Sequence, residues 1–206
     1  MSRCSRIVRR SRSVCLAGIA GVLVGLVCNC ALAQAASSAS CAGQVFSQPF
    51  SAWKDSNYYT LVPGGEFNSP DEGWELYGGA KILTGVRPNG SRAGVLDLPS
   101  GSVAVSPPEC VTLAYPTARV WVRDLKGAEG VMVAVAYLGT SRTITSPQNV
   151  GQVHGQQSEW TLSNPFNVQP QIGGGEGTRE ARFVFAAPGR SSEYQLYGLW
   201  VDPRMN

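Results

Sequence analysis

Residues 119–138 read Arg-Val-Trp-Val-Arg-Asp-Leu-Lys-Gly-Ala-Glu-Gly-Val-Met-Val-Ala-Val-Ala-Tyr-Leu. Valine and aromatic residues are frequent in two runs, Arg119–Leu125 and Val131–Leu138, and glycines bound the short segment between them. Such residues pack well on a pleated, half-buried surface, whereas glycine lets a chain turn sharply. The stretch therefore predicts two β-strands with a turn between them.

The first run alternates between small apolar side chains and larger ones. Val120 and Val122 occupy one set of positions, and the other set is Arg119, Trp121 and Arg123. Successive side chains of a strand point to opposite faces of the sheet. The pattern predicts a half-buried strand that places two arginines and a tryptophan on the face away from the valines.

Similar runs recur along the rest of the chain. Glycine and proline interrupt the sequence every eight to fifteen residues, and the run Ala181–Phe185 alternates in the same way. After Ser40, no stretch longer than ten residues has the apolar spacing of a helix. Short strands separated by turn residues are typical of antiparallel sandwiches and barrels. We expect an all-β fold, a single antiparallel two-sheet β-sandwich domain.

The first 35 residues have the composition of a secretory signal peptide. Five arginines lie at the start, an almost uncharged apolar run extends from Val14 to Leu32, and the segment ends with Ala33-Gln34-Ala35. A basic start, an apolar middle and an A-x-A exit are typical of a cleaved export signal. We expect residues 1–35 to be the signal, 36–40 a short linker and 41–206 the sandwich domain of a secreted, extracellular protein.

Membrane retention fits this segment less well than cleavage does. The apolar run of 19 residues is borderline for a span, and its glycines and Asn29 weaken it. A lipoprotein anchor at Cys41 lacks the leading leucine, and nothing completes a twin-arginine pattern around Arg9 and Arg10. We expect general export and no stable membrane span after cleavage.

The charge balance changes when the signal is removed. The whole chain carries 17 basic and 14 acidic residues, a formal charge of +3 with a pI near 8.6. Five of the arginines and none of the acids lie in residues 1–35, which leaves 12 basic against 14 acidic residues, a charge of −2. Sequence-independent binding to phosphate needs clustered Lys and Arg. We therefore expect no binding to nucleic acid or to an anionic membrane surface.

The cysteine count changes in the same way. Four of the six cysteines lie in the signal, which leaves Cys41 and Cys110. Two cysteines in an exported chain are most simply one disulfide, with two unpaired buried thiols as the alternative. The bridge would close a loop spanning 69 residue positions. In the chain-entropy model a loop of that size contributes roughly 4 kcal/mol.

A second informative stretch is residues 61–85, which read Leu-Val-Pro-Gly-Gly-Glu-Phe-Asn-Ser-Pro-Asp-Glu-Gly-Trp-Glu-Leu-Tyr-Gly-Gly-Ala-Lys-Ile-Leu-Thr-Gly. Phe67 and Trp74 are expected to fill one core from two sides of a tight loop, because the glycines permit sharp turns. The skeleton resembles the opening of galactose-binding-like jelly rolls, the fold of many non-catalytic carbohydrate-binding modules. The chain also resembles a group of secreted bacterial proteins that pair an early cysteine with one after a Ser-Pro-Pro segment, here Cys41 and Cys110.

The resemblance bears on metal binding as well as on fold. Such modules often hold a structural calcium through the Glu after the signature Phe and an Asp on the final strand. In this chain Asn68 replaces that Glu, and Tyr197 and Gly198 lie where the acidic pair is expected. Because calcium needs several hard oxygen ligands, we expect no cofactor, with a structural calcium as the disfavoured alternative. The remaining calcium candidates are Asp71, Glu72 and Asp202.

Catalytic chemistry is poorly represented. His154 is the only histidine, and no Gly-x-Ser-x-Gly segment exists to present a nucleophile. The densest acidic residues, Asp71, Glu72 and Glu75, lie around Gly73-Trp74 and are expected to form a solvated loop tip rather than a glycosidase pair. We expect a non-enzyme, with glycoside hydrolysis as the disfavoured alternative.

The candidate ligand-binding residues are Arg119, Trp121 and Arg123, joined by Tyr137 from the next strand. Aromatic faces and directed polar groups are the usual elements of a small-ligand site. In the alternative, Trp121 belongs to the core and the arginines extend past it to solvent. Tyr197 and Trp200 are expected on opposite faces of the last strand, mostly within the core.

These observations favour a secreted, non-catalytic binding module for carbohydrate or another extracellular ligand. The alternatives are a structural or adhesive domain and a domain that binds a secreted protein partner. Neither alternative needs an aromatic groove, so the exposure of Trp121 discriminates between them and the first hypothesis.

Overall fold

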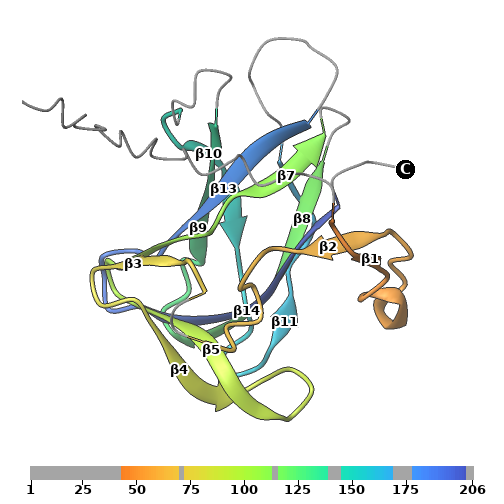
Figure 1. The fold of residues 1–206 in the computed structure, drawn as a ribbon. Helices are drawn as coiled ribbons and strands as arrows, with labels where there is room; N and C mark the ends of the chain where they lie inside the picture. The colour runs from red at the N-terminus through yellow and green to blue at the C-terminus, as the bar shows by residue number, and fades with distance from the viewer. Residues whose placement is uncertain (1–42, 70–71, 113–115, 139–144, 169–177, 203–206) are drawn as a thin grey trace, which may run out of the picture. The chain divides into compact units, whose positions relative to one another are not determined.

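Two antiparallel β-sheets make up the fold in the computed structural model, which describes residues 43–69, 72–112, 116–138, 145–168 and 178–202 (Figure 1). The elements are β1 (Phe46–Ser47), a 3₁₀ turn η1 (Ser51–Trp53), β2 (Tyr59–Leu61), β3 (Glu75–Tyr77), β4 (Lys81–Val86), β5 (Arg92–Pro99), β6 (Val103–Val105), β7 (Glu109–Thr112), β8 (Thr117–Lys126), β9 (Val131–Leu138), β10 (Gln148–Val153), β11 (Thr161–Leu162), β12 (Phe166–Asn167), β13 (Thr178–Ala186) and β14 (Glu193–Asp202). The expected all-β, two-sheet antiparallel β-sandwich is confirmed.

The first sheet has the order β1-β2-β14-β5-β4, and β14 also pairs with β8, which in turn pairs with β11 and β12. The second sheet has the order β10-β9-β13-β6-β3, and β7 also pairs with β13. Strand β14 is therefore the centre of the first sheet and β13 the centre of the second. Both central strands lie in residues 178–202, so neither sheet is complete without that segment.

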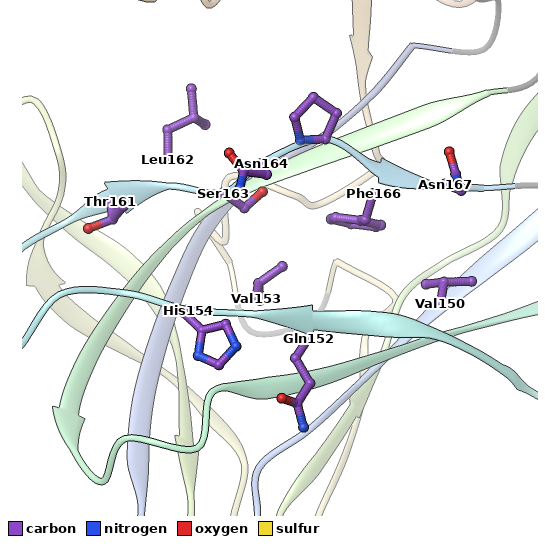
Figure 2. Close-up of a pocket in the computed structure, with 11 residues that line it drawn as sticks. Val150, Gln152, Val153, His154, Thr161, Leu162, Ser163, Asn164, Phe166 and Asn167 are labelled. Carbon is purple, nitrogen blue, oxygen red and sulfur yellow. The ribbon is translucent and has the colours of Figure 1, made fainter.

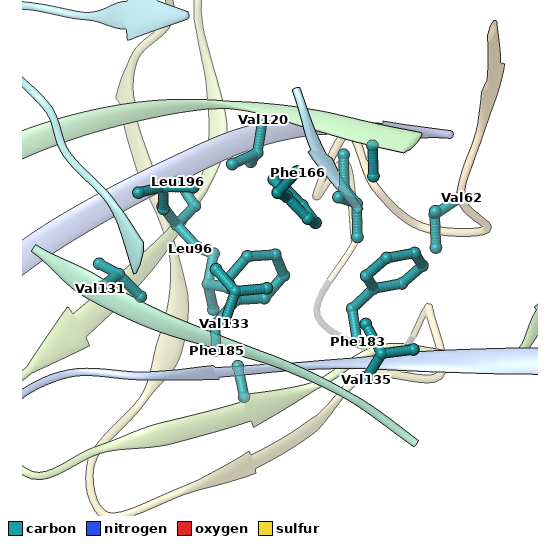
Figure 3. Packing of buried hydrophobic residues seen from close by; sticks show 14 of the residues in the cluster. Val62, Leu96, Val120, Val131, Val133, Val135, Phe166, Phe183, Phe185 and Leu196 are labelled. Carbon is teal, nitrogen blue, oxygen red and sulfur yellow. The ribbon is translucent and has the colours of Figure 1, made fainter. Parts of the chain in front are cut away.

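The core between the sheets is built from the alternating positions of the long strands (Figure 3). On β8, Val120 and Val122 are fully buried, and on β13 Phe183 and Phe185 are fully buried. Burying one such side chain contributes on the order of 2 kcal/mol. The alternation that the sequence predicted for both strands is thus the pattern that supplies the core.

Phe67 and Trp74 lie in this core, as the loop sequence predicted. Their ring centroids are 5.0 Å apart, and Trp74 also stacks on Phe185 at 6.3 Å. Gly94 on β5 permits the close packing, since a Cβ built there would lie 1.6 Å from the carbonyl oxygen of Phe67. No side chain larger than hydrogen fits at that position without moving the loop.

The path from β8 to β9 differs from the prediction. These strands belong to different sheets, because the Gly127–Gly130 segment takes the chain from the first sheet to the second. Tyr137 on β9 is 1% exposed and belongs to the core. The prediction that Tyr137 joins the arginines and tryptophan of β8 is therefore wrong, because β14, β11 and β12 are the neighbours of β8.

A β-bulge in β14 produces a second difference. Tyr197 lies opposite Trp121 of β8 and Trp200 lies opposite Arg119, so β14 has one residue more than β8 over this interval. Gly198 adopts a left-handed φ of +64° there, which is typical of a bulge. The extra residue interrupts the strict alternation. Tyr197 packs against the core, as expected, whereas Trp200 lies outside the core cluster and meets the ring of Phe50 at 6.3 Å. Both side chains are half-buried.

The signal, the linker and Cys41 lie outside the described residues, so their predicted roles stay predictions. Cys110 on β7 is 6% exposed and disulfide-bonded. Its pairing with Cys41 remains a prediction. Within the described ranges, no helix has the length and hydropathy needed to cross a membrane.

Candidate functional site

Four of the five tryptophans lie outside the core. Only Trp74 belongs to the buried cluster between the sheets. The other four lie on the first sheet's outer face and its flanking segments, and we call this surface the tryptophan face: Trp53, Trp121, Trp160 and Trp200, with Arg119 and Arg123. Trp53 is exposed and the other three are half-buried, and a cluster of aromatic side chains at a surface is a candidate site for contact with a ligand.

Trp121 is at the centre of this surface. It is half-buried on β8 between Val120 and Val122, both of which point into the core. The ring of Trp53 meets the Trp121 ring edge-on, with centroids 5.0 Å apart, and Trp53 is 54% exposed. Two indole rings in this arrangement form an apolar corner that is open to solvent.

Trp53 is held over the sheet by the turn that carries it. In η1 the amide of Trp53 donates to the carbonyl of Phe50 at 2.8 Å. Asp55, two residues further on, accepts a hydrogen bond from the Arg119 guanidinium at 2.6 Å and another from the Tyr59 hydroxyl at 2.7 Å. These contacts fix a segment far from β8 in sequence onto the outer surface of that strand.

Asp55, which attaches the η1 turn to β8, is stabilised in its charged form. Burial alone raises the pKa of Asp55, but hydrogen bonds from Tyr59 and Arg119 outweigh it, so the pKa lies below its usual value. Burial, followed by the bond to Asp55, raises the pKa of Tyr59. Arg119 also donates to the carbonyl of Ser163 at 2.9 Å and lies over the ring of Phe50. We conclude that Arg119 mainly positions the turn that carries Trp53.

Arg123 has a different environment. Its guanidinium carbon lies 4.8 Å from the centre of the Trp160 ring, and Nη2 donates to Oε1 of Gln195 on β14. Gln195 in turn donates to Oδ1 of Asp97 at 3.3 Å, and Lys81 lies 3.7 Å from the other oxygen of Asp97. Burial lowers the pKa of Arg123. The four side chains Lys81, Asp97, Gln195 and Arg123 thus form a row across β4, β5, β14 and β8.

Trp160 is fixed by a hydrogen bond to the end of β4. Its indole Nε1 donates to the carbonyl of Val86 at the end of β4, at 2.8 Å. The ring is thus held between Arg123 and the β4–β5 hairpin. A tryptophan with its polar atom satisfied presents only its apolar faces to other groups.

The bulge glycine lies between two of these indoles. A Cβ at Gly198 would lie 3.1 Å from Nε1 of Trp200 and 3.5 Å from Cδ1 of Trp121. Tyr197, beside it, is covered by the guanidinium of Arg87 at 4.7 Å. The local backbone therefore leaves space that the aromatic rings occupy.

The face can hold a ring-shaped ligand with apolar C–H faces and polar edges. The exposed ring of Trp53 and the half-buried rings beside it supply apolar contact at low entropic cost, and Arg123 and Lys81 supply directed donors. Arg119, Trp121 and Arg123 share one face of β8, as their alternation predicted. That they bind a ligand stays a prediction.

The sequence did not single out Trp53 or Trp160. Trp53 lies in the polar stretch Ser51-Ala52-Trp53-Lys54-Asp55, and Trp160 lies just before the two-residue strand β11. Neither belongs to an alternating run, so no periodicity marked them. An aromatic residue within a polar, irregular segment is the signal that could have identified both.

A separate cleft opens between β10 and the β11–β12 segment (Figure 2). Its volume is about 370 Å³. Its lining includes the buried apolar side chains of Val153 and Phe166, which lie between the two segments, and four exposed polar side chains: Gln152, His154, Asn164 and Asn167. His154 packs over Gly130, where a Cβ would lie 2.6 Å from the imidazole. The only histidine thus lies at this cleft and outside the tryptophan face.

The metal candidates are only partly described. Asp71 lies outside the described residues, whereas Glu72 and Asp202 lie within them. Among the described parts of the chain, no three His, Cys, Asp or Glu side chains are grouped so that they could hold a metal ion. The calcium prediction on Asp71 is untested.

No protein-family model and no curated protein sequence matches the chain. Solved structures with a similar fold include a family 61 carbohydrate-binding module in complex with β-1,4-galactotriose, at 13% identity and a TM-score of 0.39, covering 68% of this chain and 93% of that one. Another is the xylan-binding domain of family 22, at 16% identity and a TM-score of 0.45, covering 72% of this chain and 96% of that one.

A third is the C-terminal family 22 carbohydrate-binding module of Clostridium thermocellum Xyn10B, at 15% identity and a TM-score of 0.44, covering 68% of this chain and 91% of that one. These TM-scores lie below 0.5, so the assignment of function below depends on the surface residues of this chain.

Proposed function

We propose that this chain is a secreted, non-catalytic carbohydrate-binding module that stacks sugar rings on the tryptophan face. The observation that carries the proposal is that four of the five tryptophans lie outside the core, with Trp53 54% exposed on top of Trp121. Sugar rings have apolar C–H faces and polar rims, which match flat indoles flanked by hydrogen-bond donors.

The carboxylates packed on this face support binding rather than hydrolysis. Asp55 is bonded to Arg119 and Tyr59, and Asp97 is bonded to Gln195 and lies near Lys81. Glycoside hydrolysis needs two carboxyl groups that are free to act on the substrate as acid and base or nucleophile. Asp55 and Asp97 both have structural partners instead.

Secretion and the disulfide belong to the same proposal. The sequence of residues 1–35 supports export, and an oxidising compartment supports a Cys41–Cys110 bridge. A free-thiol assay on the native secreted protein is expected to find no reactive thiol. Two reactive thiols would contradict the bridge.

The binding surface is tested by retention on insoluble polysaccharides and on a glycan array. We expect Trp121→Ala and Trp53→Ala to weaken binding at least tenfold, because loss of one well-placed aromatic contact costs about 2 kcal/mol or more. Tyr77→Ala is the matched control, since Tyr77 is 53% exposed on β3 of the other sheet. It should bind as the wild type does.

Thermal unfolding separates loss of binding from loss of fold. We expect Trp53→Ala to leave the melting temperature nearly unchanged, because its side chain lies on the surface. Full binding by both tryptophan variants would place the ligand elsewhere and contradict the proposal. Failure of the wild type to bind any glycan would favour a structural, adhesive or protein-binding domain.

A further inference from the structure

We infer that the glycan recognised at the tryptophan face carries carboxylate groups, as a uronic-acid polysaccharide does, and that Arg123 binds them. The inference rests on the proposed function and adds the chemical class of the sugar. Three features of Arg123 support it: its unused donors, its fixed orientation and the absence of a carboxylate partner for it within the described parts of the chain.

The donors of Arg123 are only partly used. Nη2 donates to Gln195, whereas Nε is buried and has no hydrogen-bond partner among the described residues. A guanidinium has five N–H donors. A donor that makes no hydrogen bond in a partly desolvated place costs free energy. Arg123 is half-buried, so its guanidinium is partly desolvated and partly accessible to a ligand.

The orientation of the guanidinium is set in advance. Trp160 lies against one face of the group at 4.8 Å, and the indole is itself anchored to Val86. Gln195 holds one edge of the group from the neighbouring strand. A planar fork fixed in this way is suited to a planar carboxylate, because little side-chain entropy remains to be lost on binding.

The charge of Arg123 is not neutralised as its neighbours are. The ion pairs of the described residues are Lys81–Asp97, Arg119–Asp55 and Arg182–Glu75, and Arg123 belongs to none of them. Gln195, which carries no charge, separates Arg123 from Asp97. Because the chain after residue 35 has a formal charge of −2, this cation is a local feature and not part of a general basic surface.

Lys81 on β4 is the second cation of the row that contains Arg123. Its side chain is 62% exposed, and it lies 3.7 Å from Asp97. At that exposure the pair with Asp97 contributes little to stability, so the ammonium group can meet a second carboxylate at small cost even though it is paired in the unliganded protein. A polymer with a carboxylate on successive or alternate sugars would place one near Arg123 and another towards Lys81.

Isothermal titration of the purified protein with oligogalacturonate, with glucuronic-acid-substituted xylo-oligosaccharide, and with the carboxyl-reduced form of each tests the inference. We expect at least one acidic oligosaccharide to bind about tenfold or more tightly than its reduced form, as a charge-assisted hydrogen bond predicts. The preference for the acidic form should shrink as the salt concentration is raised from 20 to 500 mM. The reason is that the Debye length falls by about fourfold or more over this range, so the attraction between charges is screened.

Arg123→Gln should bind both members of the pair equally, at the affinity of the wild type for the reduced form. Arg123→Lys keeps the charge without the fork and should retain only part of the preference. Arg190→Gln is the charge-matched control, because Arg190 is exposed in the loop before β14 and should leave the preference intact. Melting curves of all three variants check the fold, and Arg123→Lys keeps the test valid should Arg123→Gln unfold.

The outcomes separate this inference from the proposed function. Equal binding of acidic and reduced oligosaccharides, or binding of neutral glycans alone, would overturn the carboxylate inference and leave the proposed function standing. A preference unchanged in Arg123→Gln would remove Arg123 from the site. Tighter binding of sulfated than of carboxylated oligosaccharides would also contradict the inference, and no binding of any glycan would overturn both.

Discussion

At the scale of single residues, Gly198 determines how the tryptophan face is arranged. Its left-handed φ of +64° creates the bulge that places Tyr197 opposite Trp121 and Trp200 opposite Arg119. Its missing side chain leaves the space that the two indoles approach. One glycine therefore serves both the backbone conformation and the packing of the surface.

Gly198→Ala is expected to destabilise the fold by about 1–3 kcal/mol, because a Cβ is strained at positive φ and would crowd the indoles. Urea unfolding measures the change. Gly90→Ala is the matched control: its φ is +80°, but a Cβ there would meet nothing within 4 Å. Equal losses in the two variants would show that strain alone acts at Gly198 and that the indole packing contributes nothing.

Glu109 on β7 provides a second residue-scale prediction. Burial is the main cause that raises its pKa to about 7, and hydrogen bonds from Gln44 and from the backbone at Cys110 partly offset it. Since the folded-state pKa lies above the unfolded value near 4.3, the native state binds more protons between these two values. The free energy of unfolding should therefore fall as pH rises from about 4.5 to about 7.5.

Glu109→Gln should flatten that part of the pH profile, because the amide does not titrate. Chemical denaturation at several pH values measures the slope. A slope between pH 4.5 and 7.5 that is identical in the variant and the wild type would contradict the assignment to Glu109.

At the scale of elements, the turn η1 is attached to β8 through Asp55 and Arg119. The folded-state pKa of Asp55 is lowered, so its contribution to stability is fully present above the unfolded value near 3.9 and is lost as pH falls through the folded value. Both side chains are 12% exposed, so the pair is only weakly screened by solvent.

Asp55→Asn should loosen the turn that carries Trp53 and weaken glycan binding at neutral pH more than it lowers the melting temperature. The physical reason is that η1 has no buried residues, so Arg119 and Tyr59 supply much of its attachment. Amide hydrogen exchange in residues 51–57, measured beside binding, checks the prediction. Unchanged exchange in this segment would show that the tether is not needed.

The sequence predicted strands well where side chains alternate and poorly where they do not. Val120, Val122, Phe183 and Phe185 repeat with period two, so β8 and β13 and their buried faces were predictable. Strand pairing was not predictable, because alternation does not say which strand lies next to which. That is why Tyr137 was placed beside β8, although the chain crosses to the other sheet at Gly127–Gly130.

At the scale of the whole molecule, the core and the outer surface divide the aromatic residues between them. The sequence identified Phe67 and Trp74 as core residues, and the structure agrees. For Trp121 it left an outward and a core position open, and the structure places this residue half-buried on the face of β8 away from the valines. The sequence did not identify the tryptophan face, because Trp53, Trp121, Trp160 and Trp200 come from four distant segments. Only the folded sheet, with its bulge at Gly198, brings them onto one surface.

The predicted disulfide also acts at this scale. If Cys41 and Cys110 are joined, Cys110→Ser should reduce the free energy of unfolding by roughly 4 kcal/mol, because the unfolded chain regains its loop entropy. Denaturation of the variant beside the wild type measures the loss. Equal stability of the oxidised wild type and the variant would contradict a stabilising bridge.

The central claim is that sugar binds at the tryptophan face rather than in the cleft beside His154. Acrylamide quenching of tryptophan fluorescence, with and without a saturating glycan, tests this most directly, since Trp53 is 54% exposed and Trp74 is buried. We predict that bound glycan protects the fluorescence of the wild type from quenching and that the protection is smaller in Trp53→Ala. A glycan that binds without changing the quenching would contradict the claim.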